Sequence, residues 1–249
     1  MYMGYTFVFK RTEKKYLLSQ EAYLYLKKSI GGYLLPDKYG KSTICSIYLD
    51  TPDYRLIRAS TEAVNYKEKI RLRSYGTPLL ADDRVFLEIK KKCDRIVYKR
   101  RESMTLREAE TYLAGGEIPF DSQIMKELHY AMNFYHWPKP AVAISYEREA
   151  FFDRSNPDLR LTFDTGVRFR TDRLSLADGT GGQMILPEET VLLEVKSTGG
   201  MPLWLAETLD SGGIYPTSFS KYGTAYQNMI KNKIHDFKRV PESLCVHTA

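Results

Sequence analysis

The chain has 249 residues, of which 43% are apolar, and its 37 Lys and Arg against 31 Asp and Glu give a formal net charge of +6. This length allows one large β-rich domain or two smaller ones, and no apolar run approaches the roughly 20 residues of a membrane span. Three widely spaced cysteines exclude a disulfide framework and favour the reducing cytoplasm, while the positive charge favours a polyanionic partner: nucleic acid, phosphate chains or a membrane surface.

The first part of the chain alternates predicted strands and helices. Residues 5–17 predict a strand whose later part carries charge on both faces, so one face can line a polar interior. Ser19 is typical of a helix N-cap and opens a helix that ends at paired glycines. A turn over 34–41 leads to a strand over 42–50, and a short helix then runs through Ala59.

A hairpin that begins at Lys69 follows. Arg71 and Arg73 alternate with apolar residues in its first strand, as Glu88 and Lys90 do in its second. Successive side chains of a strand point to opposite sheet faces, so each strand has one charged and one apolar face. The joining segment contains Gly, Pro and paired Asp, which favours an antiparallel turn. An ordinary surface hairpin would alternate in the same way, but several further strands have this character.

The rest of the chain predicts the following elements in order: a strand over 94–103, helices over 105–114 and 121–135, strands over 141–152 and 158–170, a loop over 172–189, a strand over 191–198, and helices over 202–211 and 218–232. Thr105 and Glu108 have the spacing of a capping box. No repeat or long linker divides the chain. We therefore expect a single domain over 1–249, with a core over about 5–232 and a tail over 233–249.

Charged residues recur on one face of most predicted strands. They include Arg11, Glu13, Lys15, Arg71, Arg73, Glu88, Lys90, Lys99, Arg101, Arg148, Arg160, Glu194 and Lys196. An open sheet could expose this face to water, and a closed barrel could point it inward. The predicted helices carry apolar stripes that need sheet surface to cover. This favours an α+β fold, an antiparallel β-barrel with helices packed outside and a basic lumen that needs an anion.

The residue types of this lumen suit a polyphosphate or a nucleoside triphosphate. Arg binds phosphate oxygens in pairs, Lys adds point charge, and Glu oxygens suit Mg²⁺ or Mn²⁺ bridging the phosphates. Other chemistry has little support, because the chain has no Walker A spacing and no GxSxG, and its four His are isolated. Cys45 lies on a core strand and is interpreted as structural.

A series of short segments gives a more specific indication. In chain order these are RTEKKYLL, IYLDTPDY, KIRLRSYG, FLEIKKK, YEREAF, LRLTFDT, LLEVK and FSKY. The series resembles the VTC domain, the catalytic domain of eukaryotic vacuolar polyphosphate polymerases, which has stand-alone prokaryotic relatives and belongs to the triphosphate tunnel metalloenzymes. The resemblance covers residues 5 to 232, and no single segment of it is specific alone.

The resemblance implies a tunnel that binds a triphosphate with Mn²⁺ or Mg²⁺ and transfers the γ-phosphate of ATP to a polyphosphate chain. By position in the motifs, it implies catalytic roles for Arg71, Arg73, Lys90, Arg148, Arg160 and Lys221. The residues then expected to bind phosphate are Arg11, Lys15, Lys99, Arg101 and Lys196, and those expected to bind the metal are Glu194, Glu88 and Glu13.

Three functions remain open at this point. The first is the polyphosphate polymerase; the others are a tripolyphosphatase or nucleoside triphosphatase in the same tunnel, and a non-catalytic module that binds polyanions. Arg11 stands where the wider triphosphatase group has its first Glu, which favours polymer binding. We expect no transport across a membrane by this chain alone, because it shows neither the accessory domain nor the membrane segment of the vacuolar complex. We expect no nucleic-acid binding, since most tyrosines lie on apolar stripes. The oligomeric state stays open.

Overall fold

The computed structural model describes residues 11–62, 64–94 and 96–239. The strands are β1 (Arg11–Leu18), β2 (Leu34–Asp50), β3 (Tyr66–Tyr75), β4 (Arg84–Cys93), β5 (Ile96–Thr105), β6 (Lys139–Asp153), β7 (Arg160–Arg170), β8 (Gln183–Met184) and β9 (Val191–Thr198). The helices are α1 (Gln20–Ile30), α2 (Arg55–Thr61), α3 (Leu106–Leu113), α4 (Gln123–Phe134), the 3₁₀ turn η1 (Leu176–Asp178), α5 (Leu203–Ser211) and α6 (Lys221–Arg239).

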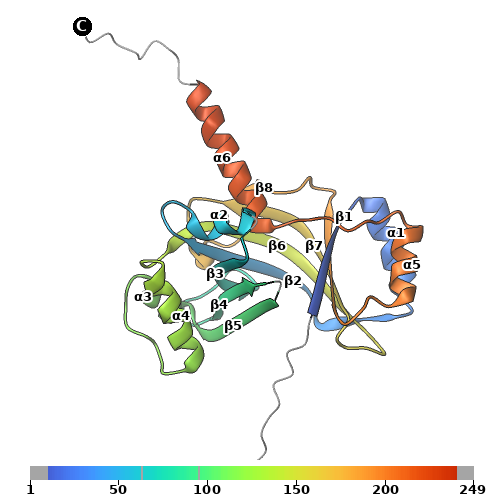
Figure 1. Cartoon of the computed structure of the whole chain (residues 1–249), viewed down its shortest axis with the longest axis horizontal. Helices are drawn as coiled ribbons and strands as arrows, with labels where there is room; N and C mark the ends of the chain where they lie inside the picture. The colour runs from blue at the N-terminus through green and yellow to red at the C-terminus, as the bar shows by residue number, and fades with distance from the viewer. Residues whose placement is uncertain (1–10, 63, 95, 240–249) are drawn as a thin grey trace, which may run out of the picture.

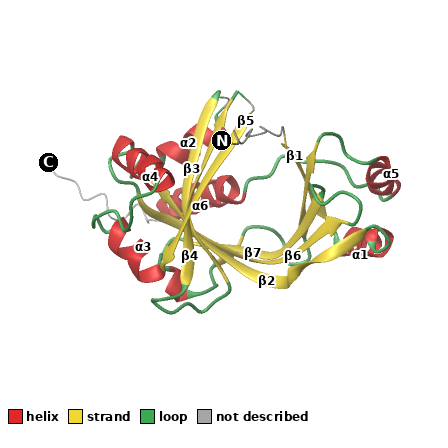
Figure 2. Ribbon diagram, turned by 90° about the horizontal axis from the view of Figure 1, so that it is seen from below, coloured by secondary structure: helices red, strands yellow, loops and turns green. Residues whose placement is uncertain are grey.

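All nine strands belong to one antiparallel sheet, so the expected α+β class is confirmed. The strand order is β1-β9-β7-β6-β2-β3-β4-β5, and β8 pairs with β7. The sheet curls without closing: β1 and β5 are its two ends, and no ladder joins them within the described residues. Figure 2 shows β2, β6 and β7 as the floor, with β3 to β5 rising on one side and β1 on the other. The curl gives the sheet a concave and a convex face.

Helices cover the convex face, as expected, in two separate groups. Helices α1 and α5 lie beside the β1 end of the sheet, and α3 and α4 lie beside the β3–β5 end (Figure 1). Leu26 of α1 and Leu205 of α5 are buried with Leu161, Leu193 and Val195 of the sheet. A second apolar cluster joins the apolar residues of β3 and β4 to those of α3 and α4. The apolar half of each strand's alternation therefore faces the helices.

The last helix, α6, contributes differently, because it packs on the concave face with α2. Its residues Tyr222, Ala225 and Met229 are buried with apolar residues of β2, β6 and β7 and with Ile57 of α2. The rings of Tyr222 and Tyr48 stack with their centroids 4.6 Å apart. Figure 1 shows α6 running from the sheet outward, so only its N-terminal part enters the concavity. This helix fills part of the concave face and leaves the charged part open.

Most boundaries match the sequence-based prediction within a few residues. Thr105 and Glu108 form the predicted capping box, and the side chain of Ser19 caps α1 by accepting from the Ala22 amide. The predicted turn over 34–41 is wrong: this segment belongs to β2 and pairs with the far end of β6 across a bulge. Polar and turn-forming residues fit this bulged strand end because it is largely exposed.

Three other segments depart from the prediction or lie partly outside the described residues. Helix α6 continues to Arg239, beyond the predicted end at 232. The loop over 172–189 contains η1 and the short strand β8. Residues 5–10 of the first predicted strand and 240–249 of the tail lie outside the described residues.

Asp50, at the end of β2, is predicted to be a main contributor to stability. Its buried carboxylate accepts hydrogen bonds from the Leu56 and Ile57 amides of α2 and from the Tyr222 hydroxyl at 2.8 Å. In Asp50→Ala these donors lose their partner, so we expect the free energy of unfolding to fall by about 3 kcal/mol. Urea denaturation should show this loss, and a smaller one in Tyr222→Phe, which removes a single bond. Equal stability of Asp50→Ala and the wild type would contradict this.

Candidate functional site

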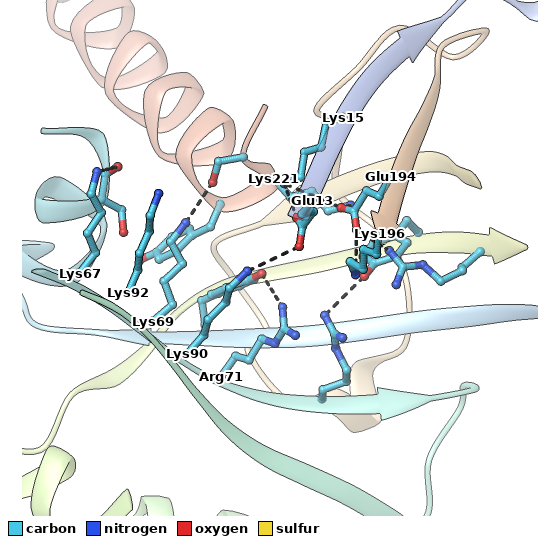
Figure 3. Close-up of a pocket in the computed structure, with 17 residues that line it drawn as sticks. Glu13, Lys15, Lys67, Lys69, Arg71, Lys90, Lys92, Glu194, Lys196 and Lys221 are labelled. Carbon is cyan, nitrogen blue, oxygen red and sulfur yellow. Dashed lines mark hydrogen bonds and ion pairs between the residues drawn. The ribbon is translucent and has the colours of Figure 1, made fainter. Parts of the chain in front are cut away.

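A strongly basic cavity of about 310 Å³ occupies the open part of the concave face. Its lining contains ten Lys and Arg residues but only two carboxylates, and the close-up in Figure 3 shows them converging from both ends of the sheet. The cations are Lys15, Lys67, Lys69, Arg71, Arg73, Lys90, Lys92, Arg148, Lys196 and Lys221; the carboxylates are Glu13 and Glu194. Like charges gathered in this way repel one another unless an anion binds between them.

Strand register explains how residues far apart in the sequence meet here. Tyr48 of β2 lies opposite Arg71 of β3, Arg71 opposite Glu88 of β4, and Glu88 opposite Arg101 of β5. Because directly paired residues share a face, one row across four strands is polar on the concave side. The curl then brings β1 across from β4, where Lys90 Nζ lies 3.8 Å from the Glu13 carboxylate.

Glu194 of β9 holds together the cations of one wall. Its carboxylate lies 3.1 Å from Lys221 Nζ, 3.4 Å from Lys196, 3.6 Å from Arg148 and 3.8 Å from Lys15. Burial by itself would raise the pKa of Glu194, but these four cations bring it well below its ordinary value. Glu194 is therefore ionised at any neutral pH and is a weak base.

Two other carboxylates support the cations from behind the cavity lining. Asp164 of β7 is completely buried and binds Arg148 in a bidentate pair at 2.6 and 2.7 Å, with Lys221 Nζ also at 2.6 Å. Such pairs fix the orientation of a guanidinium as well as its charge. Arg148 and Lys221 nevertheless form part of the cavity lining.

Glu88 of β4 likewise pairs with cations from behind the lining, on the opposite wall of the cavity. Its buried carboxylate lies 2.7 Å from Arg71 and from Lys99 and 3.3 Å from Arg101. Burial opposes its ionisation, but Arg71, Arg73 and Lys99 lower the pKa of Glu88 to about 2. Three cations from the two neighbouring strands, β3 and β5, are thereby held at defined positions.

Arg73 and Lys69 differ from these cations because neither has a described carboxylate within ion-pair distance. The buried Arg73 guanidinium donates to the Ser46 hydroxyl at 3.1 Å and to the Tyr146 hydroxyl at 3.4 Å, and Lys69 Nζ to the Ser220 hydroxyl at 3.1 Å. Neither makes an ion pair within 4 Å in the part of the chain that the structure describes. A desolvated cation without a counter-ion is costly, so these positions favour an incoming anion.

The titration of this wall reflects the same excess of positive charge. Burial, reinforced by Lys15, Lys90 and Arg71, lowers the pKa of Lys69 to about 8, although Tyr48 acts in the other direction. Burial would raise the pKa of Tyr48, but Arg71, Arg73 and Lys69 lower it to about 8. Lys69 and Tyr48 therefore lie close to their titration midpoints at mildly alkaline pH.

The sequence matches the VTC domain family over residues 10–230. The chain belongs to the VTC domain family. The comparison with curated proteins gave no match. Among solved structures, a candidate adenylate cyclase from Bacillus halodurans has a TM-score of 0.54 at 15% identity, covering 84% of this chain and 92% of its own. The candidate adenylyl cyclase HpAC1 from Hippeastrum, with a dominant triphosphatase activity, has a TM-score of 0.50 at 15% identity, covering 87% and 95%. At this identity the two structures support the fold.

Nine of the residues that sequence reasoning selected line the cavity of this VTC domain. They are Glu13, Lys15, Arg71, Arg73, Lys90, Arg148, Glu194, Lys196 and Lys221. Lys99, Arg101 and Glu88 lie directly behind or beside this lining, in contact with one another. Arg160 lies opposite Lys196 in the ladder, but it is exposed and outside the cavity lining. The side chain of Arg11 lies outside the described residues.

Several lining residues were not selected from the sequence. Lys67, Lys69 and Lys92 share the alternation of the selected cations in β3 and β4, so extending the period by one or two steps would have found them. Tyr48, Tyr146 and Tyr222 also line the cavity, although most tyrosines were expected on apolar stripes. The three rings belong to an apolar cluster, but the Tyr48 and Tyr146 hydroxyls accept from Arg71 and Arg73, and the Tyr222 hydroxyl donates to Asp50. A pattern of apolar residues alone does not indicate these hydroxyl contacts.

The donor set partly fits a divalent metal. Within the described ranges no three His, Cys, Asp or Glu side chains are grouped so as to hold one. Glu13 and Glu194 line the cavity from neighbouring strands, and Mg²⁺ is commonly held by one or two carboxylates together with substrate phosphates. Glu88 fits poorly, because its carboxylate is buried behind the cavity lining and not part of it.

No helix in the described parts is long and apolar enough to cross a membrane.

Cys45 and His129 have structural roles. Cys45 is a free, buried thiol in the apolar cluster behind β3 and β4, as its strand position predicts. His129 packs against Trp137 and shares a hydrogen bond with the Tyr112 hydroxyl, away from the cavity.

Lys69 is predicted to make the ligand-free protein less stable. Its folded-state pKa of about 8 lies below its ordinary value of 10.5, so protonation is disfavoured in the fold. The penalty is fully present below pH 8 and disappears as the pH rises from 8 to 10.5. In phosphate-free buffer at pH 7, the free energy of unfolding of Lys69→Met should therefore be higher than that of the wild type, by on the order of 2 kcal/mol.

Denaturation curves at pH 7 and pH 10 should show this gain shrinking at the higher pH. Lys92→Met is the matched control, because Lys92 lines the same cavity but is exposed. A Lys69→Met variant that is less stable than the wild type at both pH values would contradict the interpretation.

Proposed function

We propose that this VTC domain is a metal-dependent polyphosphate polymerase that transfers the γ-phosphate of ATP to a polyphosphate chain in the basic cavity. The observation that carries the proposal is that two cations, the buried Arg73 and the half-buried Lys69, have no ion-pair partner among the described residues, in a lining of ten cations and two carboxylates. Phosphate oxygens would supply the missing negative charge, and Arg binds them in pairs.

The extent of the cation row supports a long phosphate chain. Lys67, Lys69, Arg71 and Arg73 follow one another on the same face of β3, and at a rise of 3.3 Å per residue the row spans roughly 20 Å. Lys92 and Lys90 of β4 run beside it. A single triphosphate is too short to contact the entire row, whereas a polymer would fill it.

The chemistry needs positioning and charge neutralisation rather than a covalent protein intermediate. A terminal oxygen of the chain attacks the γ-phosphorus, the bond to the β-phosphate oxygen breaks, and ADP leaves. Arg71, Arg73, Lys90, Arg148 and Lys221 would stabilise the charge on the transferred group because their side chains are held in place before it arrives. Glu88 positions Arg71, and Asp164 positions Arg148 and Lys221.

The remaining predicted residues receive supporting roles in this proposal. Glu13 and Glu194 would hold Mn²⁺ or Mg²⁺, which when bound would supply positive charge against the phosphates. Lys15, Lys196, Lys99 and Arg101 would bind the phosphates of the chain. Arg160, exposed beside Lys196, would meet the chain as it enters.

Hydrolysis of tripolyphosphate or a nucleoside triphosphate is the second candidate. Support comes from HpAC1, the fold neighbour whose dominant activity is triphosphatase. Against it, hydrolysis gains from a base that accepts a proton from water, and Glu194 has a lowered pKa within a cluster of cations. The terminal oxygen of polyphosphate is already negative and needs no such base, which favours the polymerase.

The proposal predicts a polyphosphate ladder on a gel after incubation with ATP and Mn²⁺. In Arg73→Ala the kcat/KM for ATP should fall at least 100-fold, because a preorganised charge on the transferred phosphate is lost. Arg107→Ala is the matched control, since Arg107 is exposed on α3 and pairs with Asp82 away from the cavity. It should retain wild-type activity.

The products distinguish the candidate functions. Orthophosphate without a ladder would replace the polymerase by the triphosphatase. Absence of turnover with any triphosphate and metal, together with tight polyphosphate binding, would leave the polyanion-binding module.

A further inference from the structure

Aromatic rings replace lysines at one end of the charged face. Tyr75 follows Arg73 on the same face of β3, and Arg73 lies opposite Phe86 of β4. The rings of Tyr75 and Phe86 meet edge to face with their centroids 5.7 Å apart. The guanidinium of Arg101 lies 3.5 Å from the Phe86 centroid and 5.3 Å from that of Tyr75. The three side chains form a small platform next to a buried, unneutralised cation.

Packing of the fold does not account for this platform. Neither Tyr75 nor Phe86 belongs to any of the three apolar clusters of the described residues, and Tyr75 is 47% exposed. Arg101 lies 3.3 Å from the Glu88 carboxylate, and its guanidinium covers one face of Phe86. The exposed Tyr75 ring and the outer face of the guanidinium offer π-surfaces to which a flat ligand can stack.

We propose that Tyr75, Phe86 and Arg101 form the binding site for the base of a nucleoside triphosphate. The inference rests on the proposed use of a triphosphate in the adjoining cavity and adds where the nucleoside lies. Bases stack on aromatic side chains and on Arg whatever their hydrogen-bonding edges, so the site should accept purines without distinguishing ATP from GTP strongly.

This placement also fixes the direction of the triphosphate. From Tyr75, the next residues on the same face are Arg73, Arg71 and Lys69, at intervals of roughly 6.6 Å. A base at Tyr75 therefore puts the α-phosphate beside Arg73 and directs the γ-phosphate toward Lys69 and Lys90. The acceptor chain then occupies the lysine end of the row.

Calorimetric titrations with ATP and with inorganic tripolyphosphate, both without divalent metal so that no turnover occurs, test the site. In Tyr75→Ala the Kd for ATP should rise about tenfold, the range of one stacked base, and the Kd for tripolyphosphate should stay within twofold. Phe86→Leu should behave in the same way. Tyr75→Phe keeps the ring and should bind both ligands as the wild type does.

Tyr39→Ala is the matched control, since Tyr39 is an exposed tyrosine outside the cavity and should change neither Kd. The inference is overturned if Tyr75→Ala and Phe86→Leu leave ATP binding unchanged, or weaken ATP and tripolyphosphate equally. Failure of the wild type to bind either ligand would overturn both the inference and the proposed function.

Discussion

The main physical constraint on this structure is the mutual repulsion of the cations on the concave face of one curled sheet. Ten Lys and Arg side chains line the cavity against two carboxylates. Two further carboxylates, Glu88 and Asp164, hold several of these cations from behind, each at distances below 3.4 Å. The carboxylates fix geometry but do not cancel the charge. The fold therefore keeps a site whose electrostatic cost is relieved only by an anion.

Strand alternation makes this arrangement compatible with a stable core. The apolar residues of β3 and β4 that pack with α3 and α4 are Ile70, Leu72, Val85, Leu87 and Ile89. Arg71, Arg73 and Lys90, on the opposite face of these strands, line the cavity. A slip of one residue in register would exchange the two sets and expose the core, so the core also fixes the positions of the cations. Apolar packing outside thus sustains the charged face inside.

Much of this could be predicted from the sequence, because alternation is a local signal. The charged face of the hairpin and eight of the nine selected lining residues lie on alternating strands, whereas Lys221 was selected only through the resemblance to the VTC domain. The tertiary curl is not local, so alternation does not indicate that β1 and β4 meet at Glu13 and Lys90, or that Asp164 is buried beneath Arg148. The segment over 34–41 looked like a turn because its pairing partner lies more than 100 residues away.

The comparisons and the geometry support the account at different levels. Family membership and the two fold neighbours establish a VTC domain with the curled antiparallel sheet. The proposed chemistry rests on this chain's own side chains, above all on Arg73 and Lys69. The aromatic platform and the row of lysines at opposite ends of β3 then give the cavity a direction.

The central claim is that the cavity is built for a phosphate chain, and thermal unfolding tests it most directly. The unfolding midpoint should be measured with inorganic tripolyphosphate and, separately, with sodium chloride at the same ionic strength. A ligand that binds only the folded state raises the midpoint by mass action, whereas salt only screens the repulsion. The account predicts a midpoint several degrees higher with tripolyphosphate than with sodium chloride. Equal midpoints in the two solutions would contradict it.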